Sequence, residues 1–226
     1  MFALLPGHHF FVTAFFGLLG AAGGTAVLAQ VGRDRGSRKQ DELWHSWGGA
    51  PTTRLLRHRH IPGDPELSEG LRQQIEKWWG KPLPTDQEEA ADPESADARY
   101  REVTLALQEA TRDRSKFELV FAENVNYGFR RNMWGLKPWG LPIAVALALV
   151  AWALFVLTVW GRSWPDPWWN VLVNPDSIAV IRLSVAVANS AFATFWLFWA
   201  KPSWIKPAAE AYAKQLMESV RTLEAD

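Results

Sequence analysis

The first apolar stretch of the sequence constrains the fold most strongly. Residues 10–31 read FFVTAFFGLLGAAGGTAVLAQV and contain no charged side chain. At about 1.5 Å per helical residue, such a helix crosses a hydrocarbon core of about 30 Å. A charged cluster follows directly, made of Arg33, Asp34, Arg35, Arg38 and Lys39. Because Lys and Arg beside a membrane helix stay preferentially in the cytoplasm, the pattern predicts a spanning helix with residues 1–9 outside.

This run is interpreted as a retained anchor rather than a cleaved signal peptide. Residues 27–29 (VLA) are compatible with a cleavage site. However, the residues before the run carry no Lys or Arg, and the positive charge follows it, which is the reverse of a secretory signal.

Two further runs of spanning length lie in the C-terminal half, at residues 141–160 and 177–199. Basic residues come before the first run and after the second, whereas the connection 161–176 has one Arg and two Asp. These charges predict an integral membrane protein of the all-α class with three transmembrane helices, an outside N-terminus and a cytoplasmic C-terminus.

Tryptophan placement supports the same topology. Trp collects at headgroup depth because its ring is largely apolar and its N–H is polar. Tryptophans lie at the ends of the predicted spans: Trp134 and Trp139 inside, Trp160, Trp164, Trp168 and Trp169 outside, and Trp196, Trp199 and Trp204 inside again.

Residues 32–140 are predicted to form a helical cytoplasmic domain. Residues 64–66 (DPE) resemble a helix start, and Gly80 a helix end. Residues 81–93 read as a polar linker, and a second helix is expected from Asp92. A third helix is expected over residues 115–133.

Gly135 and Pro138 are expected to break that third helix before the span begins. The tail, residues 200–226, carries an amphipathic stripe that includes Tyr212 and Leu216. It is expected to pack on the cytoplasmic domain, on a sister subunit or on the membrane surface.

Polar residues inside the predicted third span are candidates for lining a pore. Arg182 and Asn189 are seven positions apart and therefore share a helix face. Intramembrane charges usually face water or a partner. Alternatively, Arg182 reaches the outer headgroups and Asn189 bonds a neighbouring helix. In the first span, Gly20 and Gly24 form a small-xxx-small pattern suited to oligomer packing or to packing within one chain.

The segment from Trp44 to His60 is the densest polar feature. Arg54, Arg57 and Arg59 are candidate phosphate contacts, and Trp44 and Trp47 are candidate stacking platforms for a base. The same arginines also suit anionic lipid headgroups, or salt bridges between subunits to the acidic block at residues 61–100.

A second candidate segment lies just before the second span. Arg130 and Arg131 are further phosphate candidates, and Tyr127 is a third stacking candidate. The segment is interpreted either as a membrane-proximal anchor or as an element that couples ligand binding to helix movement.

Other chemistries find little support in the sequence. The absence of cysteine excludes disulfides, thiolate catalysis and Cys-ligated metal. His58, His60 and Asp64 lack a metal-site spacing and are interpreted as solvated. The sequence has no nucleophile elbow, phosphate-binding loop or dinucleotide motif, so neither an enzyme nor a cofactor is expected.

The phrases ELWHSWGGAPTTRLLRHRH and ENVNYGFRRNMWGLKPWGL, together with the layout of the chain, resemble the membrane effector of the Hailong anti-phage defence system. This resemblance implies an oligomeric channel that holds a DNA-like oligonucleotide made by a nucleotidyltransferase partner, and that opens when the ligand is lost. The residues named above are assigned from this sequence and not carried over from a family site.

Two functions follow as expectations. The first is a homo-oligomeric, for instance tetrameric, ligand-gated channel or pore-forming effector in the bacterial inner membrane. In it, a basic cytoplasmic domain binds an oligonucleotide or nucleotide. The second is a non-conducting membrane adaptor whose cytoplasmic helices recruit a protein partner.

Overall fold

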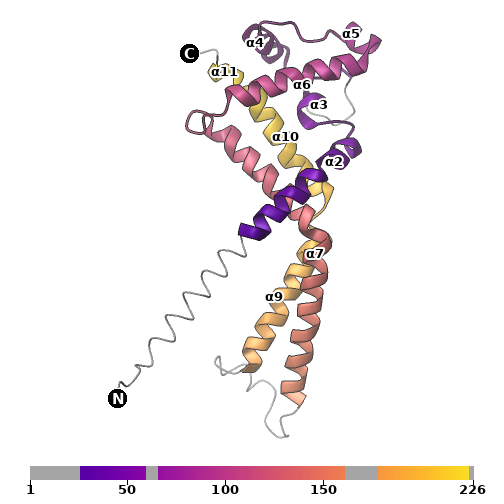
Figure 1. Cartoon of the computed structure of the whole chain (residues 1–226), viewed down its shortest axis with the longest axis vertical. Helices are drawn as coiled ribbons and strands as arrows, with labels where there is room; N and C mark the ends of the chain where they lie inside the picture. Colours follow the sequence, from indigo (N-terminus) through magenta and orange to yellow (C-terminus); the bar gives the residue numbers. More distant parts are fainter. Residues whose placement is uncertain (1–25, 60–65, 161–177, 224–226) are drawn as a thin grey trace, which may run out of the picture.

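The computed structural model describes residues 26–59, 66–160 and 178–223, and these ranges confirm the predicted all-α class. Figure 1 shows a cluster of helices, the head, joined to a stalk of two long helices. After a helix over residues 26–38, the elements are α2 (Gln40–Ser46), α3 (Pro51–Leu56), α4 (Glu69–Trp79), α5 (Asp86–Ala91), α6 (Pro93–Ala110), α7 (Glu118–Trp160), α9 (Ile178–Phe198), α10 (Pro202–Glu218) and α11 (Val220–Leu223).

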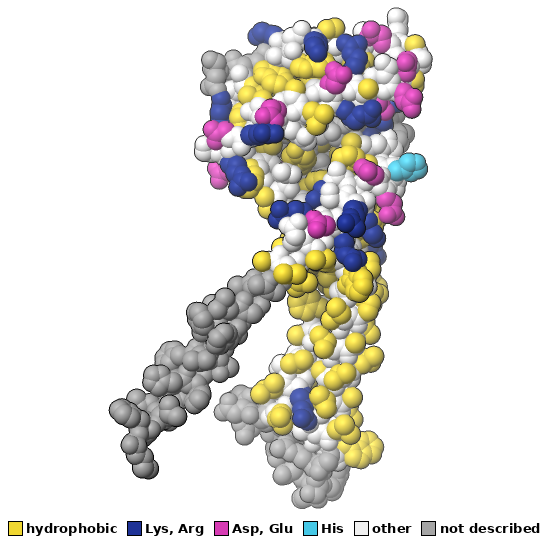
Figure 2. All heavy atoms as spheres, in the orientation of Figure 1, with side chains coloured by type: hydrophobic (Ala, Val, Ile, Leu, Met, Phe, Trp, Pro, Cys, Tyr) yellow, Lys and Arg dark blue, Asp and Glu magenta, His cyan; other side chains and the backbone are white. Residues whose placement is uncertain are grey.

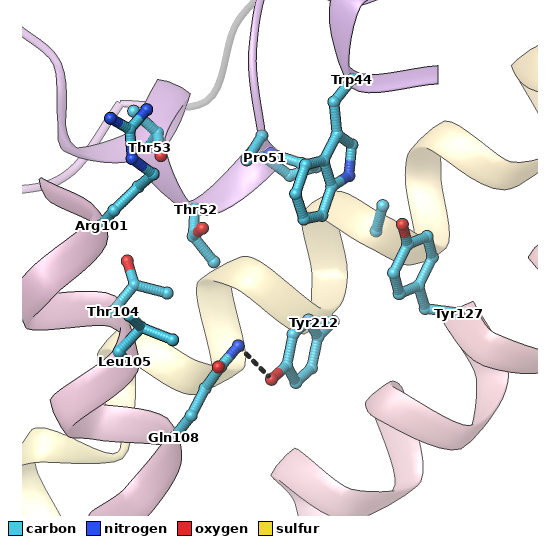
Figure 3. A pocket seen from close by; sticks show the side chains of 12 residues that line it. Trp44, Pro51, Thr52, Thr53, Arg101, Thr104, Leu105, Gln108, Tyr127 and Tyr212 are labelled. Atoms are coloured by element: carbon cyan, nitrogen blue, oxygen red, sulfur yellow. Dashed lines mark hydrogen bonds between the residues drawn. The ribbon is translucent and has the colours of Figure 1, made fainter. Parts of the chain in front are cut away.

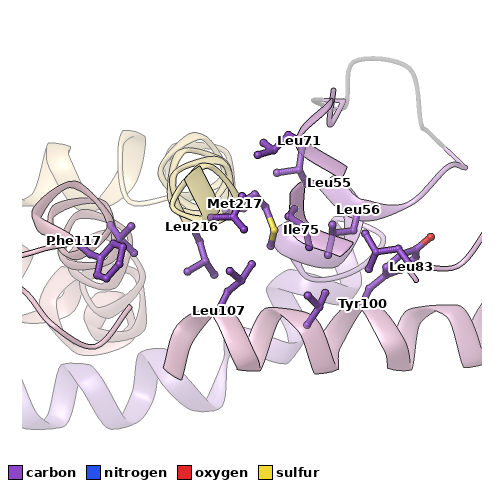
Figure 4. Packing of buried hydrophobic residues seen from close by; sticks show 14 of the residues in the cluster. Leu55, Leu56, Leu71, Ile75, Leu83, Tyr100, Leu107, Phe117, Leu216 and Met217 are labelled. Carbon is purple, nitrogen blue, oxygen red and sulfur yellow. The ribbon is translucent and has the colours of Figure 1, made fainter. Parts of the chain in front are cut away.

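One hydrophobic core holds the head together (Figure 4). Tyr100, Val103 and Leu107 recur at helical spacing along α6, and all three are fully buried. They share the core with Leu216 and Met217 of α10, which are also fully buried. Side chains from α3, α4, α7 and the segments just before α5 and α7 complete it, namely Leu55, Leu56, Leu71, Ile75, Leu83, Phe117 and Val120.

The amphipathic tail therefore belongs to the head. Of the three placements considered for it, the structure shows packing on the helical head of the same chain. Its helix α10 contacts α3, α4, α6 and α7. Ile205, Ala209 and Leu216 are almost fully buried along it, because its apolar positions face these four helices at once.

Helix boundaries in the head follow local capping chemistry. Asp92 caps α6 by accepting from the Ser95 amide at 3.0 Å, as expected, and Gly80 ends α4 with a φ of 74°. The expected start of α4 at residues 64–66 was wrong, because Ser68 caps a helix that begins at Glu69. The expected linker at residues 81–93 contains α5, which Thr85 and Glu88 start with a capping box.

The expected helix break at Gly135 and Pro138 is absent. Helix α7 runs without interruption for 43 residues, through Gly135, Pro138 and Pro142. Packed neighbours can hold a proline-containing helix straight enough to continue. One helix thus joins the head to the stalk.

The stalk is held by alanines. On α7, Ala144, Ala148 and Ala151 are buried, and they meet a seven-residue repeat of Ala179, Ala186 and Ala193 on α9. Small side chains let the two backbones approach closely. The remaining faces expose large apolar side chains such as Leu147, Leu157 and Phe192, and Figure 2 shows them covering the stalk.

Helices α7 and α9 are both long and apolar enough to cross a membrane. The second and third predicted spans lie on them. Most of the first predicted span, residues 10–31, lies outside the described residues. Only residues 26–31 of that span are described, and they are helical. Residues 1–9 and the outside loop 161–176 also lie outside the described part.

A glycine crossing ties the helix over residues 26–38 to α7. A Cβ atom on Gly135 would lie 2.6 Å from the backbone nitrogen of Gly36 and 2.9 Å from its Cα. A Cβ on Gly36 would meet the Asn132 side chain at 2.6 Å, and one on Gly32 would meet Leu136 at 3.1 Å. The close-approach motif in this region is thus Gly32-xxx-Gly36, whereas Gly20 and Gly24 lie outside the described residues.

Candidate ligand pocket in the head

A pocket of about 180 Å³ opens in the head between α2, α3, α6, α7 and α10 (Figure 3). Three aromatic side chains from distant parts of the chain form one side of it, namely Trp44 from α2, Tyr127 from α7 and Tyr212 from α10. Its lining is completed by Ala50, Pro51, Thr52, Thr53, Arg101, Thr104, Leu105, Gln108 and Ala209.

The aromatic wall is ordered by stacking. The Tyr127 and Tyr212 rings are nearly parallel, at 12°, with centroids 6.4 Å apart. Gln108 donates to the Tyr212 hydroxyl at 3.2 Å, as the dashed line in Figure 3 shows. Burial raises the pKa of Tyr212, so this phenol stays neutral at physiological pH.

Two polar atoms in this wall have no hydrogen-bond partner among the described residues. These are the Trp44 Nε1–H and the Tyr127 hydroxyl, both shielded from solvent. Burial raises the pKa of Tyr127. Because an unpaired buried polar group costs about 1–3 kcal/mol, a ligand that bonds either atom gains affinity from it.

Polar side chains also line the pocket. Thr52 and Thr53 are buried at the start of α3, and Arg101 lies exposed on α6. Within the described ranges, no carboxylate lies within 4.0 Å of Arg101. The lining thus combines apolar and aromatic surface with the exposed positive charge of Arg101.

The predicted phosphate contacts of the first segment are instead occupied within the chain. Arg57 donates to both carboxylate oxygens of Asp97, at 2.8 and 2.6 Å, and to the Gly48 carbonyl at 2.6 Å. Arg59 bonds Glu89 at 2.7 Å and Asp97 at 2.8 Å. Arg54 is buried and lies 3.5 Å from Glu210.

Glu89 is the centre of this network. It is 2% exposed and accepts from the His58 and Arg59 amides and from the Tyr100 hydroxyl, at 2.7 to 3.1 Å. Of the roles considered for the arginines, salt bridging to the acidic block is the one that the geometry displays. The bridges form within one chain rather than between subunits.

Arg130 and Arg131 join α7 to its neighbours. Arg130 donates to Asn126 at 3.1 Å and to the Trp204 carbonyl at 2.9 Å, and its guanidinium lies 5.3 Å from the Trp204 ring centroid. Arg131 bonds Gln40 of α2 and lies 5.6 Å from the Tyr127 ring centroid. Both therefore act as bridges at the lower end of the head.

Two of the three predicted stacking residues, Trp44 and Tyr127, meet in the pocket, while Trp47 packs against the cluster around Leu43. Sequence reasoning missed Tyr212 and Arg101 as pocket residues. Tyr212 was noted only as part of the amphipathic tail stripe. Arg101 gave no signal, because it is one of many cations on a helix surface.

The predicted pore residues make bonds in the stalk. Arg182 donates to the Leu154 carbonyl at 3.2 Å and to the Thr158 hydroxyl, both on α7. Asn189 donates to the Val185 carbonyl of its own helix at 2.9 Å.

His58 contacts the Pro84 carbonyl at 3.1 Å, whereas His60 and Asp64 lie outside the described residues. No group of residues that could hold a metal ion occurs in the described part.

Comparison of the chain with protein-family models, with curated proteins and with solved structures returns no match. The geometry of the pocket and the stalk is therefore the basis for a functional assignment.

Proposed function

We propose that this protein is an oligomeric, ligand-gated channel of the bacterial inner membrane that acts in anti-phage defence. One observation carries the proposal: stalk helix α7 continues into the head and carries one wall of the pocket, and stalk helix α9 is followed by α10, which carries another. Helix α7 bears Tyr127 in the head and Ala144 in the stalk. Helix α10, which bears Tyr212, follows α9 after a break of three residues.

This arrangement supports mechanical coupling. An α-helix is stiff over this length, so a ligand wedged between α7 and α10 changes the angle between their stalk continuations. The joint is reinforced where Arg130 bonds the Trp204 carbonyl and Lys137 bonds the Ala200 carbonyl at 3.1 Å. Ligand binding in the head therefore biases the packing of α7 against α9.

The proposed ligand is a nucleotide or a DNA-like oligonucleotide. Bases stack on aromatic side chains regardless of sequence, and Trp44, Tyr127 and Tyr212 offer such rings. A phosphate of the ligand would meet Arg101. Because Arg54, Arg57, Arg59, Arg130 and Arg131 already bind protein groups, Arg101 replaces them as the proposed phosphate contact. A nucleotidyltransferase partner would supply the ligand.

In the proposed assembly, several copies surround a path through the membrane, with four as one arrangement. The Arg182–Asn189 face of α9 remains the proposed lining, supported by the partial exposure of both side chains in a single chain. The basic residues beside the stalk support a cytoplasmic head in this assembly, because Lys and Arg beside membrane helices are enriched on the cytoplasmic side.

Conductance measurements test the proposal. Wild-type protein in planar bilayers should show currents that change when a short single-stranded DNA is added to the head side. The Trp44→Leu/Tyr212→Leu variant should conduct but lose this response, whereas Trp79→Leu, a half-buried tryptophan of the head outside the pocket lining, should keep it. Absence of current under every ligand condition would exclude the channel.

The adaptor function is the second candidate, and one observation favours it. Val125 and Phe129 lie one turn apart on the head portion of α7 and are 53% and 57% exposed. An apolar pair on a polar head suits a protein partner. Light scattering of detergent-solubilised protein discriminates, because a monomer or simple dimer fits an adaptor and a ring of three or more subunits fits a channel.

A further inference from the structure

The cations of the head and those of the neck differ in their counterions. The neck is the region where residues 33–39 cross α7 and where α9 meets α10. In the head, Arg57 and Arg59 pair with carboxylates at 2.6–2.8 Å. Across the described part of the chain, no carboxylate lies within 4.0 Å of the neck cations, which include Arg33, Arg35, Arg38, Lys39, Lys137 and Lys201.

Aromatic rings orient three of these neck cations without neutralising them. The Arg35 guanidinium lies 4.8 Å from the centroid of the Trp139 ring, and the Lys39 ammonium lies 4.6 Å from that of Trp134. The Lys201 ammonium lies 5.9 Å from the Phe198 ring centroid. A cation–π contact orients a cation without neutralising it. Asp34 is the one carboxylate among residues 33–39, so the neck keeps a net positive charge.

The position of the neck indicates what supplies the missing negative charge. Exposed apolar side chains cover the stalk from Ile143 onward on α7, and Trp139 and Trp199 are both 56% exposed at the upper end of this surface. Figure 2 shows dark-blue side chains gathered where the yellow stalk meets the head. In a bilayer, that level is the headgroup layer.

We propose that the neck is a binding surface for anionic phospholipids, whose phosphates pair with Arg33, Arg38 and Lys201 while their acyl chains lie along the exposed stalk. Continuity between the cation cluster and the apolar stalk favours a lipid over a nucleic acid, because only a lipid satisfies both surfaces at once. Each basic residue close to a negatively charged membrane surface adds to this attraction.

Native mass spectrometry of the full chain in detergent tests the proposal. Delipidated protein is titrated with phosphatidylglycerol and, separately, with phosphatidylcholine. The Arg33→Gln/Arg38→Gln/Lys201→Gln variant should lose phosphatidylglycerol affinity by roughly a hundredfold, given three basic residues at the membrane surface. Phosphatidylcholine binding should not change. The matched control is Arg112→Gln/Arg114→Gln/Arg221→Gln, which removes three exposed head cations and should bind as wild type.

Two results would overturn the proposal. One is unchanged phosphatidylglycerol affinity in the neck variant. The other is a neck variant that loses binding of a short single-stranded DNA while it still binds phosphatidylglycerol. If the triple variant does not fold, the single variant Arg38→Gln and a salt titration of the wild-type protein test the proposal instead. Phosphatidylglycerol affinity must then be lower in Arg38→Gln than in wild type. It must also fall in wild type as added salt screens the charges. Binding in detergent requires no current, so its failure is distinct from failure of the channel.

Discussion

Arg57 and Asp97 form a two-point ion pair that fixes the loop after α3 to the side of α6. Their nitrogen–oxygen distances are 2.8 and 2.6 Å, and Asp97 also accepts from Arg59 at 2.8 Å. One carboxylate on α6 therefore holds two of the arginines that the sequence indicates as ligand contacts. Both partners are largely buried, so the pair is expected to matter for stability.

Replacing Asp97 should destabilise the head. Asp97→Ala leaves two guanidinium groups without their shared acceptor, and breaking a buried pair in this way costs about 3 kcal/mol. Chemical denaturation of the protein in detergent, followed by circular dichroism, measures the loss. Glu94→Ala, at an exposed position on the same helix, is the control and should change stability by less than about 0.5 kcal/mol. Equal stability of the two variants would contradict a structural role for the pair.

Stability should also fall in acid because of Glu89. Burial alone raises the pKa of this carboxyl, but hydrogen bonds from His58, Tyr100 and Arg59 outweigh burial and hold the pKa below its usual range. A group with a lowered folded-state pKa stabilises the fold fully above its unfolded pKa. That contribution is lost as the pH falls through the folded value.

Denaturation of wild type between neutral pH and about pH 3 measures this loss, since an unperturbed Glu titrates near 4.3. Glu89→Gln should be less stable at neutral pH and should show a shallower decline in acid. A decline as steep as that of wild type would assign the acid sensitivity to other carboxylates.

The glycine crossing gives a prediction with an internal control. Gly135→Ala places a methyl group against the backbone of Gly36, which cannot move aside as a flexible side chain would. Such overpacking typically costs about 1–3 kcal/mol. Gly128→Ala, two turns earlier on α7, meets nothing within 4 Å and should be neutral or stabilising, because Ala favours a helix over Gly by about 1 kcal/mol. Thermal unfolding of both variants checks the difference.

The alanine seam of the stalk offers a matched pair as well. Ala186 is fully buried between α9 and α7, whereas Ala188, two positions later, is exposed. Ala186→Leu should separate the two helices and lower the unfolding midpoint in mixed micelles, since small residues allow the close approach. Ala188→Leu should leave that midpoint unchanged, and a similar drop in both variants would argue against the seam.

The reach of sequence reasoning differs between the parts of this molecule. Apolar periodicity was enough to predict α4, α6, the head portion of α7 and the buried face of the tail, because burial follows from spacing, but it did not predict α2 or α5. The expected helix break at Pro138 was wrong, because neighbouring helices pack around a residue that usually ends a helix. The cluster of basic residues led to Arg54, Arg57 and Arg59 being assigned as ligand contacts. The sequence shows these charges but not the carboxylates that lie against them in the folded chain.

The pocket is a second case in which the sequence shows the residues but not their contacts in the folded chain. Trp44 and Tyr127 are recognisable as aromatic residues in polar segments. Their meeting with Tyr212, however, depends on three helices converging from positions more than 80 residues apart in the chain. The local sequence pattern contains no information on that convergence. Arg101 becomes a pocket residue only because α6 packs beside these helices.

Arg182 separates a packing role from a conducting role. Its bonds to Thr158 and Leu154 hold α9 against α7 close to Ile178, the end of α9 that lies farther along the chain from α10. Arg182→Met and Thr158→Val should each destabilise the helix pair, and the double variant should cost no more than the larger single change. The coupling energy between such intramembrane partners averages about 0.6 kcal/mol.

If Arg182 also lines a conducting path, Arg182→Met should change single-channel conductance while Thr158→Val leaves it near the wild-type value, because only the first removes a charge. Asn189→Leu, which breaks a bond within its own helix, should change conductance without altering the stability of the pair. Equal currents in all three variants would restrict Arg182 to packing, and the proposed lining face would then have to be sought elsewhere on α9.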